Sequence, residues 1–336
     1  MRHRNRWTPR AVAALTFGVL GVVALPGAVP AQQPAAVKMA YSAQQQIPYA
    51  ASLVAWQNLK GITVEPVYMR NSPQAVQTLL KGDVQMVQTN PVAAFKAILE
   101  GGPLTVLAGL MLNEWTIVSR AEIAEPRHLA GKQLAVHSES SMSYTVAKYF
   151  VKKEAIPNVR ILFIAGSPNR AQALRSGQID ATTLYITDAV RLAMTDPGKF
   201  RVLADFSKMS EAMDSVLLVR KDWLAAHPRE AREILTTLVQ THRWMARHPA
   251  EAVERVARLF PKEKPEFVKA AVESYLEKGI WDADAALRPD LIRTVVDFLA
   301  TETGDLPKDV NRDPAAYATF APLDEVLAQL GRVGGK

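Results

Sequence analysis

Polar side chains that could hold a small ligand gather in four short segments, each of which precedes a helix-like stretch. The segments are Ser42–Gln46, Thr89–Pro91, Ser138–Ser141 and Tyr185–Asp188. Their hydroxyls and amides both donate and accept hydrogen bonds, which suits recognition of a small polar molecule. The serine run precedes a helix expected over 145–154, where the helix dipole favours an anion. Ordinary helix capping explains the same serines equally well.

Our candidate ligand contacts come from these segments, from the residue after the serine run and from one nearby tryptophan. They are Ser42, Gln44, Gln45, Asn90, Trp115, Ser138, Ser140, Ser141, Met142, Tyr185, Thr187 and Asp188. Asp188 has two readings, a helix cap or an acceptor for a ligand amine or hydroxyl. The four segments contain no Lys or Arg, and Arg70, the nearest candidate cation, is expected to be a surface arginine. Tyr49 and Tyr144 lie near the same segments, so the site is expected to combine amides, hydroxyls and aromatic rings.

Catalytic groups are scarce in this sequence. The six histidines show no metal-ligand spacing, and no nucleophile elbow, phosphate loop or dinucleotide motif is present. The absence of cysteine excludes disulfides, thiolate metal sites, thiol nucleophiles and a cysteine-linked lipid anchor. His137, at the end of a strand beside the serine run, is expected to form structural hydrogen bonds. We therefore predict a protein without catalysis, metal or cofactor.

The N-terminus has the pattern of a secretory signal peptide. Four arginines precede an apolar run over 11–25, and Val29-Pro30-Ala31 is a small-residue exit, so we expect cleavage after Ala31. An uncleaved membrane anchor is the alternative. Removing these arginines lowers the net charge from +7 to +3, which is too mild to indicate a nucleic-acid partner. The expected product is a soluble periplasmic protein.

The remaining chain is long enough for about two domain-sized cores. It contains an internal repeat with an offset of 95 residues. Ser72-Pro73 leads to Gly82, and Ser167-Pro168 leads in the same way to Gly177. Serine and proline are typical of a helix start and glycine of its end. Strand and helix candidates before and after these helices follow the same offset, which predicts two β-α-β-α-β units with mostly parallel sheets.

Two apolar segments outside the repeats, Trp115–Arg120 and Ser215–Arg220, are expected to connect the two units. The predicted organisation is a signal peptide over 1–31, a discontinuous first lobe over 32–118 and 213–336, and a second lobe over 119–212. Ligands of open parallel sheets bind beyond the carboxyl ends of the strands. The four polar segments are therefore expected to face one another across a cleft between the lobes.

Several motifs together resemble the periplasmic solute-binding proteins of ABC importers, in the group that binds aliphatic sulfonates, taurine, nitrate and thiamine precursors. The motifs are KMAYSAQQQ, KGDVQMVQTNP, HLAGKQLAVHSESSMSYTVAKYF and SGQIDATTLYITD. The resemblance implies a type II periplasmic binding protein fold, with two α/β lobes joined by two crossover segments around a ligand cleft. It places the family's ligand-holding loops on Ser138–Ser141, Thr89-Asn90 and Tyr185–Asp188.

This resemblance implies hinge closure around a small solute and delivery to a permease and an ATPase in the inner membrane, by a protein that is a monomer. The solute classes it suggests are a sulfonate, a carboxylate, a nitrate-like anion or a pyrimidine. The sequence departs from the sulfonate pattern at Glu139 and at Tyr185-Ile-Thr. A branch that synthesises thiamine pyrimidine relies on cysteines, which this chain lacks. The alternatives are a ligand sensor for a signalling receptor and an enzyme on the same fold.

Overall fold

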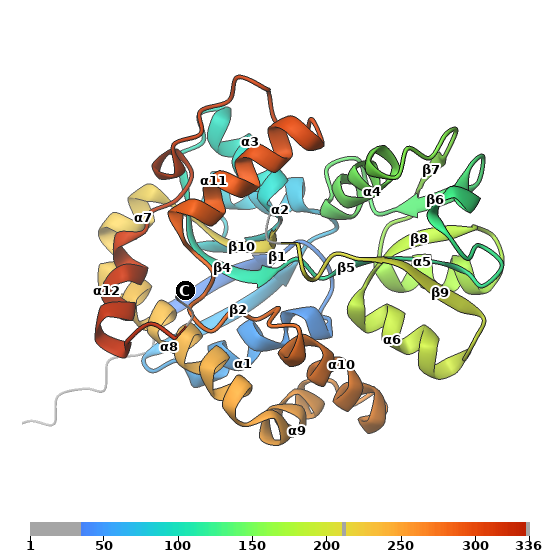
Figure 1. Cartoon of the computed structure of the whole chain (residues 1–336). Helices are drawn as coiled ribbons and strands as arrows, with labels where there is room; N and C mark the ends of the chain where they lie inside the picture. Colours follow the sequence, from blue (N-terminus) through green and yellow to red (C-terminus); the bar gives the residue numbers. More distant parts are fainter. Residues whose placement is uncertain (1–34, 210–212, 334–336) are drawn as a thin grey trace, which may run out of the picture. The chain divides into compact units, whose positions relative to one another are not determined.

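The computed structural model describes residues 35–209 and 213–333. The expected signal peptide lies outside the described residues. Two sheets organise the described chain, each with helices on both faces (Figure 1). The first sheet has the order β2-β1-β3-β10-β4 and the second the order β7-β6-β8-β5-β9.

The first sheet and the helices around it form the first lobe. Its strands are β1 (Ala35–Tyr41), β2 (Ile62–Tyr68), β3 (Met86–Thr89), β4 (Leu104–Leu112) and β10 (Met213–Arg220). Helix α1 (Ala50–Asn58) covers one face, and α2 (Ser72–Lys81) and α3 (Pro91–Leu99) cover the other (Figure 1). Strand β1 pairs in parallel with β2 and β3, as the repeat predicts, because a helix connects each strand to the next.

The second lobe repeats this arrangement with elements from the middle of the chain. Its strands are β5 (Trp115–Arg120), β6 (Gln133–Val136), β7 (Arg160–Phe163), β8 (Ala181–Tyr185) and β9 (Phe200–Asp205), and its helices are α4 (Met142–Lys153), α5 (Ser167–Arg175) and α6 (Ile186–Thr195). The predicted helix starts at Ser72 and Ser167 are confirmed. Gly82 and Gly177 follow these helices with φ of 82° and 75°, a left-handed conformation that favours glycine.

The two segments expected as connections are instead whole strands of the sheets. Strand β5 pairs along its length with β8 and β9, so residues 115–118, assigned from the sequence to the first lobe, belong to the second sheet. Strand β10 likewise lies wholly in the first sheet, antiparallel to β3 and β4. The chain therefore crosses between lobes at 113–114, just before β5, and again between β9 and β10. An apolar strand pattern cannot distinguish a crossing from a paired strand.

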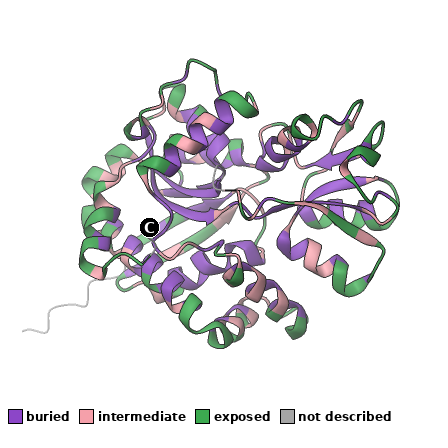
Figure 2. Cartoon of the chain, viewed as in Figure 1, coloured by how far each residue is buried: buried purple, intermediate pink, exposed green. Residues whose placement is uncertain are grey.

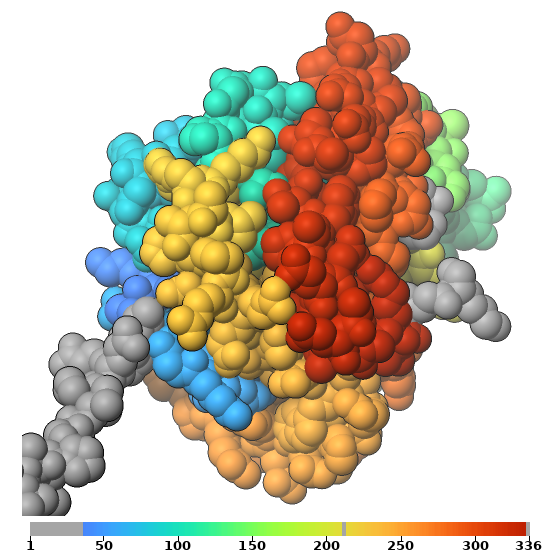
Figure 3. Space-filling model, turned by 90° about the vertical axis from the view of Figure 1, so that its left-hand side faces the viewer, coloured from blue at the N-terminus to red at the C-terminus, as the bar shows by residue number. Residues whose placement is uncertain are grey.

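The remaining α-helices of the described chain all belong to the first lobe. They are α7 (Lys221–Ala226), α8 (Pro228–Arg247), α9 (Pro249–Leu259), α10 (Pro265–Glu277), α11 (Pro289–Asp297) and α12 (Ala321–Leu330). Helix α8 buries Ile234, Leu238 and Met245, which confirms the apolar stripe in the sequence. The C-terminal segment lies beside α7 and α8 on the surface (Figure 3), where Arg232 donates to Glu325.

Buried residues concentrate in the inner strands of both sheets and on the helix faces that cover them, whereas the outer helix faces are exposed (Figure 2). The outer strands β2, β7 and β9 are mostly exposed or half-buried. Inner strands covered on both faces are typical of such sheets. In the described part of the chain, no helix is both long and apolar enough to span a membrane.

Candidate functional site

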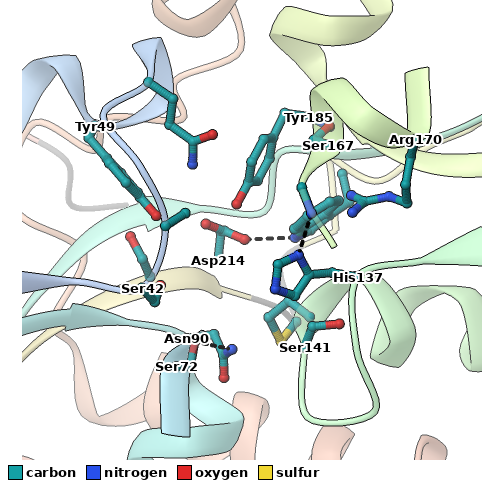
Figure 4. A pocket seen from close by; sticks show the side chains of 16 residues that line it. Ser42, Tyr49, Ser72, Asn90, His137, Ser141, Ser167, Arg170, Tyr185 and Asp214 are labelled. Atoms are coloured by element: carbon teal, nitrogen blue, oxygen red, sulfur yellow. Dashed lines mark hydrogen bonds between the residues drawn. The ribbon is translucent and has the colours of Figure 1, made fainter. Parts of the chain in front are cut away.

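A cavity of about 60 Å³ lies between the two lobes, beyond the carboxyl ends of the parallel strands (Figure 4). The first lobe contributes Ser42, Ala43, Gln46, Tyr49, Ser72, Asn90, Asp214 and Ser215, and the second contributes Trp115, His137, Ser141, Met142, Gly166, Ser167, Arg170 and Tyr185. The cavity has room for several water-sized positions, so it accepts a small ligand.

The cavity has an approximate twofold character that follows from the repeat. Four pairs of lining residues lie 95 positions apart: Ser42 and His137, Gln46 and Ser141, Ser72 and Ser167, and Asn90 and Tyr185. Each lobe therefore presents the same set of loops to the ligand, with different side chains. A cavity built from equivalent positions of two lobes requires both lobes for a complete set of contacts.

Strands β5 and β10 also reach the cavity because they run antiparallel to their neighbours. In the second sheet Trp115, the first residue of β5, pairs with Tyr185, the last residue of β8. In the first sheet Val216 of β10 pairs with Thr89, the last residue of β3. The amino ends of β5 and β10 therefore lie where the parallel strands end, which places Trp115 and Asp214 in the site.

On the first-lobe side, Asn90 holds its own loop in position. Its Oδ1 accepts from Ala93 N at 2.9 Å and caps α3, while its Nδ2 donates to Ser72 Oγ at 2.9 Å. The same Nδ2 donates to Ser140 O at 3.3 Å, across the cleft. Asn90 is thus a helix cap that also links the two lobes.

On the second-lobe side, Ser141 caps α4. Its Oγ accepts from Tyr144 N at 3.3 Å and from Ser138 N at 3.2 Å, and donates to Ser138 O at 2.6 Å. The hydroxyl of Ser141, the residue of the serine run that lines the cavity, is therefore already engaged by its own loop. Capping, one of the two readings of the serine run, is what this structure shows.

His137 faces the centre of the cavity (Figure 4). Its Nδ1 accepts from Gly166 N at 2.9 Å, so in the neutral ring the proton lies on Nε2. Burial, and secondarily the charge of Arg170, lower the pKa of His137 to about 4. The ring is therefore neutral at physiological pH and offers one N–H donor.

Arg170 of α5 is completely buried and lines the cavity. Its Nε donates to Thr183 O at 2.9 Å and its Nη1 to Ile164 O at 3.1 Å, which ties α5 to β8 and to the loop after β7. Burial lowers the pKa of Arg170 to about 10, and the nearby Tyr185 and Asp188 oppose that shift. The guanidinium remains charged near pH 7.

Two buried carboxyl groups, Glu114 and Asp214, lie where the chain passes between the lobes. Asp214 Oδ1 accepts from Trp115 Nε1 at 2.7 Å, and the Trp115 ring lies against the Tyr185 ring with centroids 4.4 Å apart. Burial raises the pKa of Asp214 to about 7 despite the hydrogen bond from Trp115. Burial also raises the pKa of Glu114 well above its usual range, and the neighbouring Asp214 and Asp188 raise it further.

The lobes contact each other on both sides of the cavity. On one side, Asp305 of the first lobe accepts from Lys148 Nζ at 2.6 Å and from Thr145 Oγ1 at 2.7 Å, both of α4. On the other, Arg191 of α6 forms two hydrogen bonds to Glu263, at 2.9 and 3.0 Å, and lies 3.7 Å from the Phe267 ring centroid. The structure therefore has the lobes closed around the cavity.

The cavity brings together half of the candidate contacts. Those that line it are Ser42, Asn90, Trp115, Ser141, Met142 and Tyr185. Gln45 instead donates to Leu259 O and accepts from Tyr68 on the first lobe, and Gln44 is exposed. Arg70 is also exposed and outside the lining, as expected for a surface arginine.

The other candidates lie outside the lining for local reasons. Ser138 and Ser140 form hydrogen bonds through their backbones. Ser138 N donates to Ser141 Oγ, and Ser140 O accepts from Asn90 Nδ2. Thr187 and Asp188 are buried in the first turn of α6, next to the cavity-lining Tyr185. Asp188 acts electrostatically on Arg170 rather than lining the cavity.

Sequence reasoning missed lining residues that did not occur in polar loops. Ser72 and Ser167 were read only as helix starts, and Arg170 only as part of a helix, yet all three point into the site (Figure 4). Asp214 preceded an apolar run that was read as a connection. The repeat could have identified the two serines as site residues, because equivalent positions of the two units occupy equivalent places beside the cleft.

The arrangement can bind a small polar ligand through hydroxyls, amides, aromatic rings and buried charges. Within residues 35–209 and 213–333 no group of His, Asp and Glu residues has the geometry of a metal site. The hydroxyl of Ser141 donates to a backbone carbonyl instead of to a neighbouring base, so it is not arranged as a nucleophile.

Comparison with known proteins agrees with this architecture. The family model described as NMT1/THI5 like matches residues 46–252. A solved structure from Bordetella bronchiseptica RB50 is similar with a TM-score of 0.72 and 18% identity, over 89% of this chain and 99% of its own. No curated protein sequence matches the chain.

Two further solved structures have titles that state a ligand. The alkanesulfonate-binding protein SsuA from Xanthomonas axonopodis pv. citri is similar with a TM-score of 0.65 and 18% identity, over 85% of this chain and 98% of its own. The periplasmic nitrate-binding protein NrtA from Synechocystis PCC 6803 is similar with a TM-score of 0.71 and 12% identity, over 88% of this chain and 89% of its own. At these identities the likeness shows the fold, and the predicted periplasmic binding protein fold is confirmed.

Proposed function

The chain belongs to the NMT1/THI5-like family, and we propose from this premise that it is the extracytoplasmic solute-binding component of an ABC importer. It captures one small polar organic solute in the cleft and delivers it to a permease and its ATPase in the inner membrane. The fold shared with a sulfonate-binding and a nitrate-binding protein supports this assignment.

One observation carries the proposal: a small cavity is lined by equivalent positions of two lobes that the chain connects twice. A ligand that contacts both lobes stabilises the closed arrangement, and the population shifts by the difference between its affinities for closed and open forms. Hinge closure of this kind needs only small backbone changes in the segments that join the lobes. The permease then recognises the closed lobes.

Ligand binding and closure can be tested directly on protein purified from the periplasm. A panel of sulfonates, carboxylates, nitrate, amines and pyrimidines is screened by thermal denaturation, because a ligand that binds only the folded state raises the melting temperature. Small-angle scattering of the same samples measures closure. A panel without any shift in melting temperature or radius of gyration contradicts the proposal.

Export and partner are tested by separate measurements. We propose a periplasmic monomer released by cleavage after Ala31, which fractionation, N-terminal sequencing and light scattering examine. The transporter role requires that the liganded protein stimulate the ATPase of a permease reconstituted in vesicles. Stimulation of a signalling receptor by the liganded protein, without effect on any permease, would contradict it.

A further inference from the structure

Two buried carboxyl groups beside the cavity, Asp214 in its lining and Glu114 behind it, have no counter-ion within residues 35–209 and 213–333. Glu114 is fully buried, and neither carboxyl oxygen has a hydrogen-bond partner in the described structure. Asp214 is 6% exposed, and within the described residues its side chain has one hydrogen bond, from the neutral indole of Trp115. A buried carboxylate without a cation is costly, which is why burial raises the pKa of both groups. A cation that enters the cavity would remove this cost and allow Asp214 to ionise.

Aromatic side chains surround the Asp214 carboxyl. It lies between the phenol groups of Tyr49 and Tyr185, and Trp115 donates to it from one side (Figure 4). A buried ammonium needs acceptors for its three N–H groups, and phenol oxygens as well as a carboxyl group can supply them. A carboxyl group between two phenol groups is therefore chemically suited to an ammonium group.

Groups that could bind an anion in the same cavity are partly engaged. The guanidinium of Arg170 donates to two backbone carbonyls, and its charge is partly offset by Asp188. The N-termini of α3 and α4 are capped by Asn90 and Ser141, whereas those of α5 and α6, at Gly166 and Tyr185, have no side-chain cap in the described structure. The observation that favours a cation is therefore the buried carboxyl pair, in which both oxygens of Glu114 are unpartnered.

We propose, on the basis of the solute-binding function above, that the charged group of the solute is a protonated amine. The ammonium contacts Asp214 beside the phenol groups of Tyr49 and Tyr185 and favours the ionised form of that carboxyl. Glu114 places a second carboxyl group behind the lining. The cavity volume of about 60 Å³ favours a small amine. This charge is opposite to that of the sulfonate and nitrate bound by the two structural neighbours.

Matched probes separate charge from size. Isothermal titration compares ethanolamine with ethanesulfonate, which carry opposite charges. It also compares taurine with isethionate, in which a hydroxyl group replaces the ammonium group. We expect each amine to bind at least about tenfold more tightly than its partner. Equal or tighter binding of ethanesulfonate or isethionate overturns the charge assignment and leaves the solute-binding function intact. If none of the four probes binds, this inference is also overturned. The solute-binding function is then tested by the broader panel above.

Variants locate the ammonium contact. Asp214→Asn retains an oxygen to accept from Trp115 and removes the charge, so amine affinity should fall at least about tenfold and isethionate affinity should not fall. Glu114→Gln, in which the Trp115 contact is untouched, should also weaken amine binding. Asp83→Asn is the matched control, because Asp83 is exposed and precedes β3, so it lies at the end of that strand opposite to the cavity. Melting curves verify that each variant is folded, and unchanged amine affinity in Asp214→Asn overturns the inference.

Discussion

At the scale of single residues, the buried carboxyl of Asp214 should make stability depend on pH. Its pKa of about 7 in the folded protein lies above the ordinary value of 3.8, so the folded state keeps a proton that the unfolded chain releases between these values. The stabilisation from the protonated carboxyl is complete below the lower value and is lost as the pH rises through the higher one. Glu114, Tyr49 and Tyr185 surround the group, and none of them supplies a positive charge.

We therefore expect wild type to lose stability relative to Asp214→Asn as the pH rises through this interval, by up to about 1.4 kcal/mol per pH unit. Urea unfolding of both unliganded proteins between about pH 4 and about pH 9 measures the difference. Because Asp214 also raises the pKa of Glu114, the same pair is compared in a Glu114→Gln background, which isolates Asp214. A difference that is constant across this range would show that Asp214 is ionised throughout.

His137 provides a second prediction at this scale. Burial lowers its pKa to about 4 from the ordinary 6.5, and Gly166 N–H donates to its Nδ1. We expect nitrogen NMR of the imidazole to show the neutral ring with its proton on Nε2, unchanged between about pH 5.5 and about pH 8. A midpoint near the ordinary value would mean that His137 is exposed to solvent in the dominant state.

At the scale of elements, Arg170 should be important for the packing of α5. Its planar guanidinium donates to carbonyls on β8 and after β7 at once, and a lysine cannot reproduce that geometry. We expect Arg170→Lys to lower the free energy of unfolding by about 2–4 kcal/mol, because buried acceptors lose charged donors. Arg175→Lys on the same helix is the control. Its partly exposed ion pair with Asp196 should contribute less than about 1 kcal/mol. Equal losses in the two variants would contradict the packing role of Arg170.

The repeat is also the reason that much of the fold was predictable at this scale. Helix-start and helix-end residues recur at a fixed offset, so Ser72 to Gly82 and Ser167 to Gly177 identify two equivalent helices. The pairing of β5 and β10 was not predictable, because an apolar run records burial and not the partner strand. Asp214 was missed for the same reason, since its place in the site depends on the antiparallel direction of β10.

The candidate site is only partly predictable, because polar residues in loops indicate the position of a loop but not the direction of its side chains. Loop position correctly indicated Ser42, Asn90 and Tyr185 as neighbours of the cleft, and these line the cavity. It also selected Gln45, whose side chain turns to the first lobe and contacts Leu259 and Tyr68. The direction of a side chain depends on packing between segments far apart in sequence, which local composition does not record.

At the scale of the whole molecule, the contacts around Asp305 are expected to set the balance between open and closed lobes. Asp305 is 8% exposed and holds two side chains of α4, while Lys148 also donates to Thr303 O at 3.0 Å. These bonds join the lobes without any ligand. They should raise the closed fraction of the unliganded protein, which increases apparent affinity by reducing the conformational cost of binding.

Two variants, one on each side of this contact, test the idea. Asp305→Ala in the first lobe and Lys148→Met in the second should each increase the radius of gyration of the unliganded protein and weaken ligand binding by about tenfold. Because both remove the same contact, the double variant should be little worse than either single one. Asp309→Ala, an exposed carboxylate nearby in sequence, is the control. Additive losses in the double variant, or an unchanged radius of gyration, would show that the Asp305 contact stabilises a single lobe and does not control closure.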